Sequence, residues 1–242
     1  MENIYIILSA TPTIMGKLIR TLTKEPFNHS SISLSENWSE MYSYARYNVS
    51  NPLVGGFIRE YPQRLSLGKD KKVYIEVYEI QVSKEQYEKI KTFIYNIRDD
   101  KEKYIYNSIA AVGLLFGSKF NAYKADICSN FVVKSLLYGD IIQNIDTQKI
   151  ISPSEIRNMI SEYLNFSGYL NNYIPIMGES YELCDFFNKT NIIIELKKTF
   201  SHFYTLFKRY MQNYLNYTYD KKRKILLKNH ISSSDNKHIA KE

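Results

Sequence analysis

The sequence is poor in cysteine, histidine and glycine, and these shortages exclude several classes of protein. Its 242 residues include two cysteines, four histidines and nine glycines. Two cysteines are too few for a disulfide scaffold or a zinc ribbon. A glycine-rich phosphate loop, a HExxH helix and a CxxC pair are all missing from the sequence. We therefore expect neither a metal nor a nucleotide cofactor.

Long apolar runs are also missing. One of the longest, residues 109–116, is far too short to span a bilayer. The first three residues lack the basic region of a signal peptide, so we expect a cytoplasmic protein. The composition, 44% hydrophobic, excludes wholesale disorder and is enough for one globular domain with a real core.

Positive charge is confined to the C-terminal end. Residues 191–242 contain 11 basic and 4 acidic residues, and the difference of +7 equals the net charge of the whole chain. Residues 1–190 are neutral, so the main body has no field that favours nucleic acid. We expect a body at 1–190 and, at 191–242, an aromatic helix with a basic tail. The tail's charge is suited to weak contact with an anionic membrane surface through Lys221, Lys222, Arg223 and Lys224.

Hydrophobic periodicity predicts an α+β fold. Alternating residues predict four strands, at 5–9, 29–35, 39–47 and 73–81, of which the middle two form a hairpin. Helical spacing predicts helices at 11–23, 83–96, 107–116, 128–138 and 192–217, and one that begins at 152. Ser83 with Gln86 and Ser152 with Glu155 have the spacing of capping boxes. We expect a loop around 51–56, a polar connection at 163–173 and a frayed tail at 220–242.

Cys128 and His29 are the residues best suited to chemistry. Cys128 opens a predicted helix, where free N–H groups and the helix dipole stabilise a thiolate. His29 is the only histidine of the neutral body, and an imidazole is what a thiolate needs for acyl transfer. The other cysteine, Cys184, has acidic neighbours that raise a thiol pKa, so we expect it to be inert.

A third group must orient the imidazole, and the second strand of the hairpin is the predicted source. If Ser35 lies opposite Ser39, the His29 face carries Met41, Ser43 and Ala45; a shift by one residue puts Glu40, Tyr42 and Tyr44 there instead. We expect Glu40 first, because only its side chain bears a charge, with Ser43 as the alternative. Arg59 and Glu60 form either a salt bridge or a substrate clamp, and the sequence does not decide between these.

Three segments together resemble a known family: FNHSSISLSENWSEMYSYAR, NPLVGGFIRE and ADICSNFVVKSLL. They look like permuted papain-like cysteine hydrolases, distant relatives of the NlpC-type cell-wall hydrolases, in the YiiX/YycO-like branch. In that branch a histidine at the start of a strand precedes the cysteine that opens a helix, and His29 and Cys128 have this order. The resemblance covers about residues 3–175. It implies a circularly permuted papain-like fold, with a small antiparallel sheet packed against helices.

The resemblance implies a cysteine-dependent hydrolase or acyltransferase acting on an amide or ester. Cys128 is then the nucleophile and His29 the general base and then acid. The oxyanion hole would consist of the Cys128 N–H and a second donor, which we expect from residues 8–11 because this stretch follows the first predicted strand. The substrate is a peptide, a cell-wall fragment or a lipid. The alternative is a catalytically silent binding module of the same fold, whose basic end contacts a membrane or a partner.

Overall fold

The computed structural model describes residues 1–68, 72–113, 120–147, 149–174, 185–188 and 190–239. Within these ranges, the side chains of residues 15, 23 and 217–239 are not described. The fold is α+β, built on an eight-stranded sheet with the strand order β7-β6-β4-β3-β2-β1-β5-β8. All strand pairs are antiparallel except β6 and β7, which are parallel, so the sheet is mixed. With eight strands it is also larger than the small antiparallel sheet that we expected.

The strands are confirmed where the sequence alternates. The central ones are β1 (Glu2–Ser9), β2 (His29–Ser33), β3 (Met41–Asn48) and β5 (Tyr74–Val82). The predicted hairpin is β2–β3, and its register places Ile32 opposite Tyr42 and Ser33 opposite Met41. Continued along both strands, this register puts Ser43 on the His29 face and Glu40 on the opposite face. It is the first of the two registers that the sequence left open.

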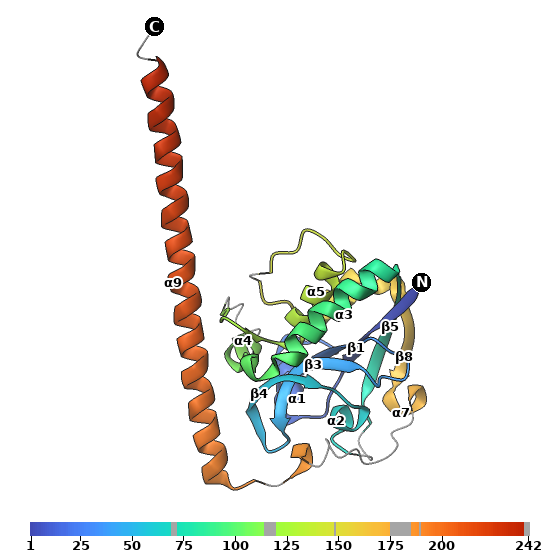
Figure 1. Ribbon diagram of the computed structural model, residues 1–242. Coiled ribbons are helices and arrows are strands. Elements are labelled where there is room, and N and C mark those ends of the chain that lie inside the picture. The colour runs from blue at the N-terminus through green and yellow to red at the C-terminus, as the bar shows by residue number, and fades with distance from the viewer. Residues whose placement is uncertain (69–71, 114–119, 148, 175–184, 189, 240–242) are drawn as a thin grey trace.

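Helices cover both faces of the sheet. On one face α3 (Lys84–Asp99), α5 (Cys128–Tyr138) and α6 (Pro153–Met159) bury an apolar core against β1 and β2. On the other face α2 (Pro62–Ser66) and α7 (Leu170–Tyr173) enclose a second core around Trp38. Figure 1 shows these helices on the two sides of the strands. Both predicted capping boxes form. The helix predicted at 11–23 is α1 (Ile14–Thr23), capped by Thr13.

The loop expected around residues 51–56 was wrong, because this segment belongs to strand β4 (Asn51–Arg59). Gly55 pairs with Arg46 and Gly56 with Ala45 on β3. A Cβ atom at Gly55 would lie 2.2 Å from the backbone oxygen of Ala45. The glycines therefore allow two strands to approach closely, rather than break a strand.

The polar connection expected at 163–173 was also wrong. Most of it forms the edge strand β8 (Leu164–Tyr169), which pairs with β5, and α7. The side chains of β8 are mostly exposed, so the segment lacks the apolar alternation of an inner strand. Two short strands, β6 (Ile105–Tyr106) and β7 (Ala125–Asp126), complete the other edge. Of the helix predicted at 107–116, α4 (Ser108–Gly113) is described, and residues 114–116 lie outside the described residues.

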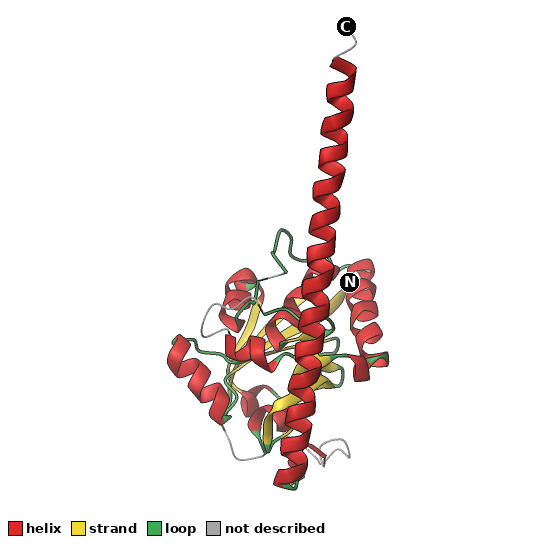
Figure 2. Cartoon of the chain, turned by 90° about the vertical axis from the view of Figure 1, so that its left-hand side faces the viewer, coloured by secondary structure: helices red, strands yellow, loops and turns green. Residues whose placement is uncertain are grey.

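The predicted C-terminal helix is longer than expected. It is α9 (Ile192–Ile239), a single helix of 48 residues, so the frayed tail expected from 220 onward was wrong. Its first half packs on the body through Leu206, which is fully buried against Ala122 and Ala125. Its second half extends well past the body (Figures 1 and 2). None of the described helices has both the length and the apolar character needed to cross a membrane.

Candidate active site

Cys128 is the first residue of α5, as predicted. The residue before it, Ile127, is extended and gives the helix no side-chain cap. The first N–H groups of α5 therefore lack both intrahelical partners and a capping side chain. Their partial positive charge stabilises a thiolate at Cys128. The side chain is 8% exposed and lines a pocket, so the sulfur is largely desolvated yet reachable from the pocket.

His29 opens β2, and its imidazole lies between a thiol and a carboxylate. Its Nε2 is 2.9 Å from a carboxylate oxygen of Glu60. The imidazole also hydrogen-bonds with Cys128. The other Glu60 oxygen accepts a hydrogen bond from Arg64 Nε at 3.0 Å. Side chains from α5, β2, the residue after β4, and α2 thus form a chain from Cys128 through His29 and Glu60 to Arg64.

Burial and these contacts determine the protonation of the groups. Burial lowers the pKa of His29, but the hydrogen bonds with Cys128 and Glu60 outweigh it and raise that pKa to about 10. Burial raises the pKa of Cys128, yet the hydrogen bond and charge of His29 bring it below its ordinary value. For Glu60, too, burial raises the pKa, and His29 and Arg64 lower it further than burial raises it. Each group therefore favours the charged form of the other, so the contact shifts the pair toward a thiolate beside an imidazolium.

The pocket around this pair has a polar and an apolar part. Arg46 and Tyr106 stand beside the reactive groups, and both line the pocket. Burial and the nearby Cys128 raise the pKa of Tyr106 well above its ordinary value, so its phenol stays protonated. The apolar lining comes from Ile19, Pro52, Leu65 and Phe186. The pocket wall therefore combines these apolar side chains with the reactive groups.

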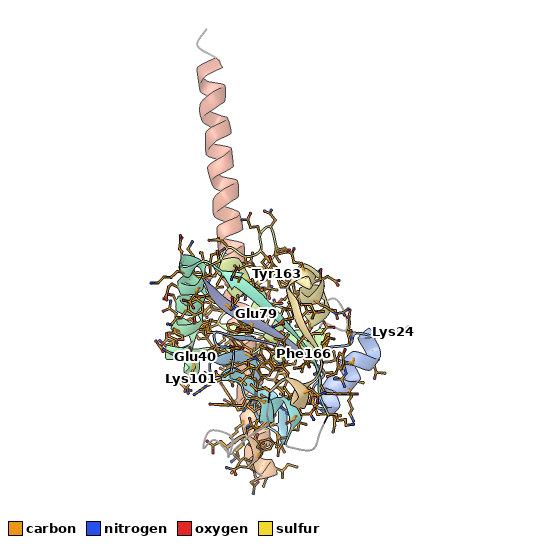
Figure 3. The ribbon with its side chains drawn as sticks, turned by 90° about the vertical axis from the view of Figure 1, so that its right-hand side faces the viewer. Lys24, Glu40, Glu79, Lys101, Tyr163 and Phe166 are labelled. Atoms are coloured by element: carbon orange, nitrogen blue, oxygen red, sulfur yellow. The ribbon has the colours of Figure 1, made fainter. Side chains whose placement is uncertain are left out.

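The structure does not place the expected orienting residues against His29. Glu40 accepts a hydrogen bond from Tyr95 Oη at 2.5 Å, and Figure 3 shows it on the side of the body opposite Lys24, at the end of α1. Ser43 lies on the His29 face, but its hydroxyl donates to the backbone oxygen of Ser30 at 2.7 Å. The partner of the imidazole is Glu60 instead, from the end of β4 and not from the hairpin.

The oxyanion donor expected from residues 8–11 stays a prediction. Leu8 and Ser9 are paired within the sheet, and the Ala10 N–H donates to the Tyr74 carbonyl. Thr11 is the residue of this stretch that lines the pocket. Its hydroxyl accepts a hydrogen bond from Asn28 at 2.6 Å. With the Cys128 N–H at the start of α5, the Thr11 region remains the candidate second side of an oxyanion hole.

Sequence reasoning missed the roles of Glu60, Arg64 and Tyr106. The spacing of Glu60 and Arg64 is one signal, because residues four apart across a helix start often pair. The contact of Glu60 with His29 has no local signal, since 31 residues separate them.

Cys184 lies outside the described residues. The side chains of Lys221, Lys222, Arg223 and Lys224 are likewise not described. Among the described residues, no group of three or more His, Cys, Asp or Glu side chains is arranged to hold a metal ion.

Comparison with protein-family models, with curated proteins and with solved structures finds no match to this chain.

Proposed function

We propose that this protein is a cysteine-dependent hydrolase or acyltransferase acting on an amide or ester, with a circularly permuted papain-like fold. The observation that carries the proposal is the buried contact of His29 with both Cys128 and Glu60 at the wall of a pocket. Covalent acyl transfer by a cysteine uses a nucleophile that contacts a base, and a carboxylate that contacts and orients this base. The order of the strand histidine and the helix cysteine supports the permuted arrangement.

The reaction follows from the protonation of the pair. The Cys128 sulfur attacks the acyl carbon, and a carbon–sulfur bond forms as the bond to the leaving amine or alcohol breaks. The His29 imidazolium gives its proton to that leaving group. Water or an acceptor amine then gives a proton to the neutral imidazole and attacks the acyl carbon, which releases the thiolate. Glu60 stabilises the imidazolium in the resting state and after the second step.

Alkylation of Cys128 by iodoacetamide tests the proposal without knowledge of the substrate. We expect rapid labelling at pH values below the ordinary thiol pKa, because the pKa of Cys128 is lowered, and a nearly flat rate up to about pH 10, where His29 loses its proton. His29→Ala should move the onset of labelling toward the ordinary thiol pKa, near about 8.5. Mass spectrometry identifies the labelled residue.

The Cys128→Ala variant is the control, because it leaves Cys184 as the other cysteine of the sequence and gives the background rate. Slow labelling of Cys128, with the same pH profile in wild type and His29→Ala, would contradict the proposal. The protein would then be a silent binding module that retains the pocket.

A further inference from the structure

The charges that line the pocket do not cancel. Cys128 and His29 together contribute no net charge, whichever of them holds the proton, Glu60 contributes one negative charge, and Arg64 and Arg46 contribute two positive charges. The described lining residues therefore carry a net charge of +1. Glu60 is shared between His29 and Arg64, so both of its oxygens are engaged. Arg46 is near Glu60 but makes no ion pair with a carboxylate among the described residues.

The described contacts of Arg46 position its guanidinium without an ion pair. Its Nη1 donates to the carbonyl of Val49 at 3.2 Å, and its guanidinium lies 5.6 Å from the centre of the Phe186 ring. Its own backbone oxygen accepts a hydrogen bond from Arg64 Nη2 at 2.5 Å. Burial and the charge of Arg64 lower the pKa of Arg46, and the charge of Glu60 offsets only part of this effect. A partly buried guanidinium beside a second one is costly unless an anion accompanies it.

The local backbone fixes this side chain at the pocket. Arg46 lies on β3, and the pairing of β3 with β4 changes register between Arg46 and Asn48. Irregularities of this kind bend a strand and redirect its side chains, often beside an active site. Arg46 is therefore held by a sheet rather than by a mobile loop, as a binding group requires.

We propose that the substrate attacked by Cys128 carries a separate anionic oxygen group, a carboxylate or a phosphate, and that Arg46 binds it. This inference rests on the proposed function and specifies its substrate class. The planar guanidinium matches both groups, because each offers two oxygens to parallel N–H donors. The scissile acyl group and the anion are then bound in one pocket, with Arg46 selecting acidic substrates over neutral ones.

Two alkylating reagents that differ only in charge test this assignment. Iodoacetate and iodoacetamide react at the same carbon, where a carbon–sulfur bond forms and iodide leaves. Both reagents attack the same thiolate, so the fraction of Cys128 that is ionised cancels in the ratio of their rate constants. We expect a ratio several-fold higher than that measured for N-acetylcysteine amide in the same buffer.

The variants locate the source of the preference. Arg46→Gln should lower the iodoacetate-to-iodoacetamide ratio several-fold, and Arg46→Lys should retain part of it, because the charge stays while the paired donors are lost. Lys17→Gln removes an equal charge from an exposed position on α1 and should leave the ratio unchanged. Circular dichroism of each variant verifies that it is folded.

Protection experiments distinguish the two kinds of anion. Propionate and inorganic phosphate are added separately during iodoacetamide labelling of the wild type, and the one that slows labelling identifies the preferred group. If labelling depends on His29 but the ratio is the same in wild type and Arg46→Gln, the anionic substrate is refuted and the proposed function stands. If labelling is slow and independent of His29, the proposed function itself fails.

Discussion

Glu60 illustrates why the carboxylate that contacts His29 was not predictable. The sequence supplied two candidates on the neighbouring strand because hairpin partners are close in the chain. The observed register is one of the two that we considered, and it places Ser43 on the His29 face. The actual partner comes from the end of the next strand, β4, whose Asn-Pro and Gly-Gly pairs resemble a loop. The places of Cys128 at a helix start and His29 at a strand start were predictable, because the signals for such starts are short-range. The His29–Glu60 contact depends on the packing of three strands.

Replacing Glu60 by glutamine tests the orienting role. The amide side chain in Glu60→Gln retains a hydrogen-bond acceptor but not the charge that helps to raise the pKa of His29. The thiolate is then less stabilised, so the onset of iodoacetamide labelling should move to higher pH, though less than in His29→Ala. Removing one partner of a buried ion pair should also cost about 3 kcal/mol of unfolding free energy, measured in urea.

The matched control is Glu40→Gln, which removes the same charge from the carboxylate that the sequence favoured. Glu40 pairs with Tyr95 rather than with the imidazole, so its labelling profile should match that of the wild type. A shifted profile in Glu40→Gln together with an unchanged one in Glu60→Gln would reverse the assignment.

At the scale of elements, the sequence predicts best where a capping signal adjoins an amphipathic run. Ser83 and Gln86 make both hydrogen bonds of the capping box, and α3 buries Ile90 and Ile94 against the sheet. Strand β8 carries no comparable signal, because its residues face solvent at the edge of the sheet. Its strand conformation comes from pairing with β5, which no local pattern records.

The cap of α3 can be removed without altering the core. The Ser83 hydroxyl accepts a hydrogen bond from the Gln86 N–H at 3.2 Å, and the Gln86 side chain accepts one from the Ser83 N–H. Ser83→Ala should lower the free energy of unfolding by about 1 kcal/mol, because the N–H of Gln86 loses its acceptor. Ser83→Asp, which restores an acceptor, should unfold at nearly the same urea concentration as the wild type. Equal losses in both variants would show that the cap does not stabilise α3.

At the scale of the whole molecule, α9 supports the strands that lead to the pocket. His202 on α9 hydrogen-bonds through Nε2 with the backbone oxygen of Tyr106 at 2.8 Å. Arg209 donates to the carbonyl of Lys124, just before β7. Strand β6 carries Tyr106, and β7 ends two residues before Cys128. The helix outside the resembling region is thus part of the support of the candidate site.

Two adjacent residues of α9 differ in burial, and their substitution tests whether α9 stabilises the body. Leu206 is fully buried against the β6–β7 edge, whereas Phe207 is 59% exposed. Leu206→Ala should cost about 3 kcal/mol, because the lost methyl groups leave a cavity between the helix and the sheet. Phe207→Ala removes a larger side chain, yet it should change the free energy of unfolding by less than about 0.5 kcal/mol, as substitutions at exposed positions usually do. Urea unfolding of both variants measures the difference. If Leu206→Ala is no more destabilising than Phe207→Ala, α9 does not stabilise the body, and the edge that carries Tyr106 must be held by the remaining sheet alone.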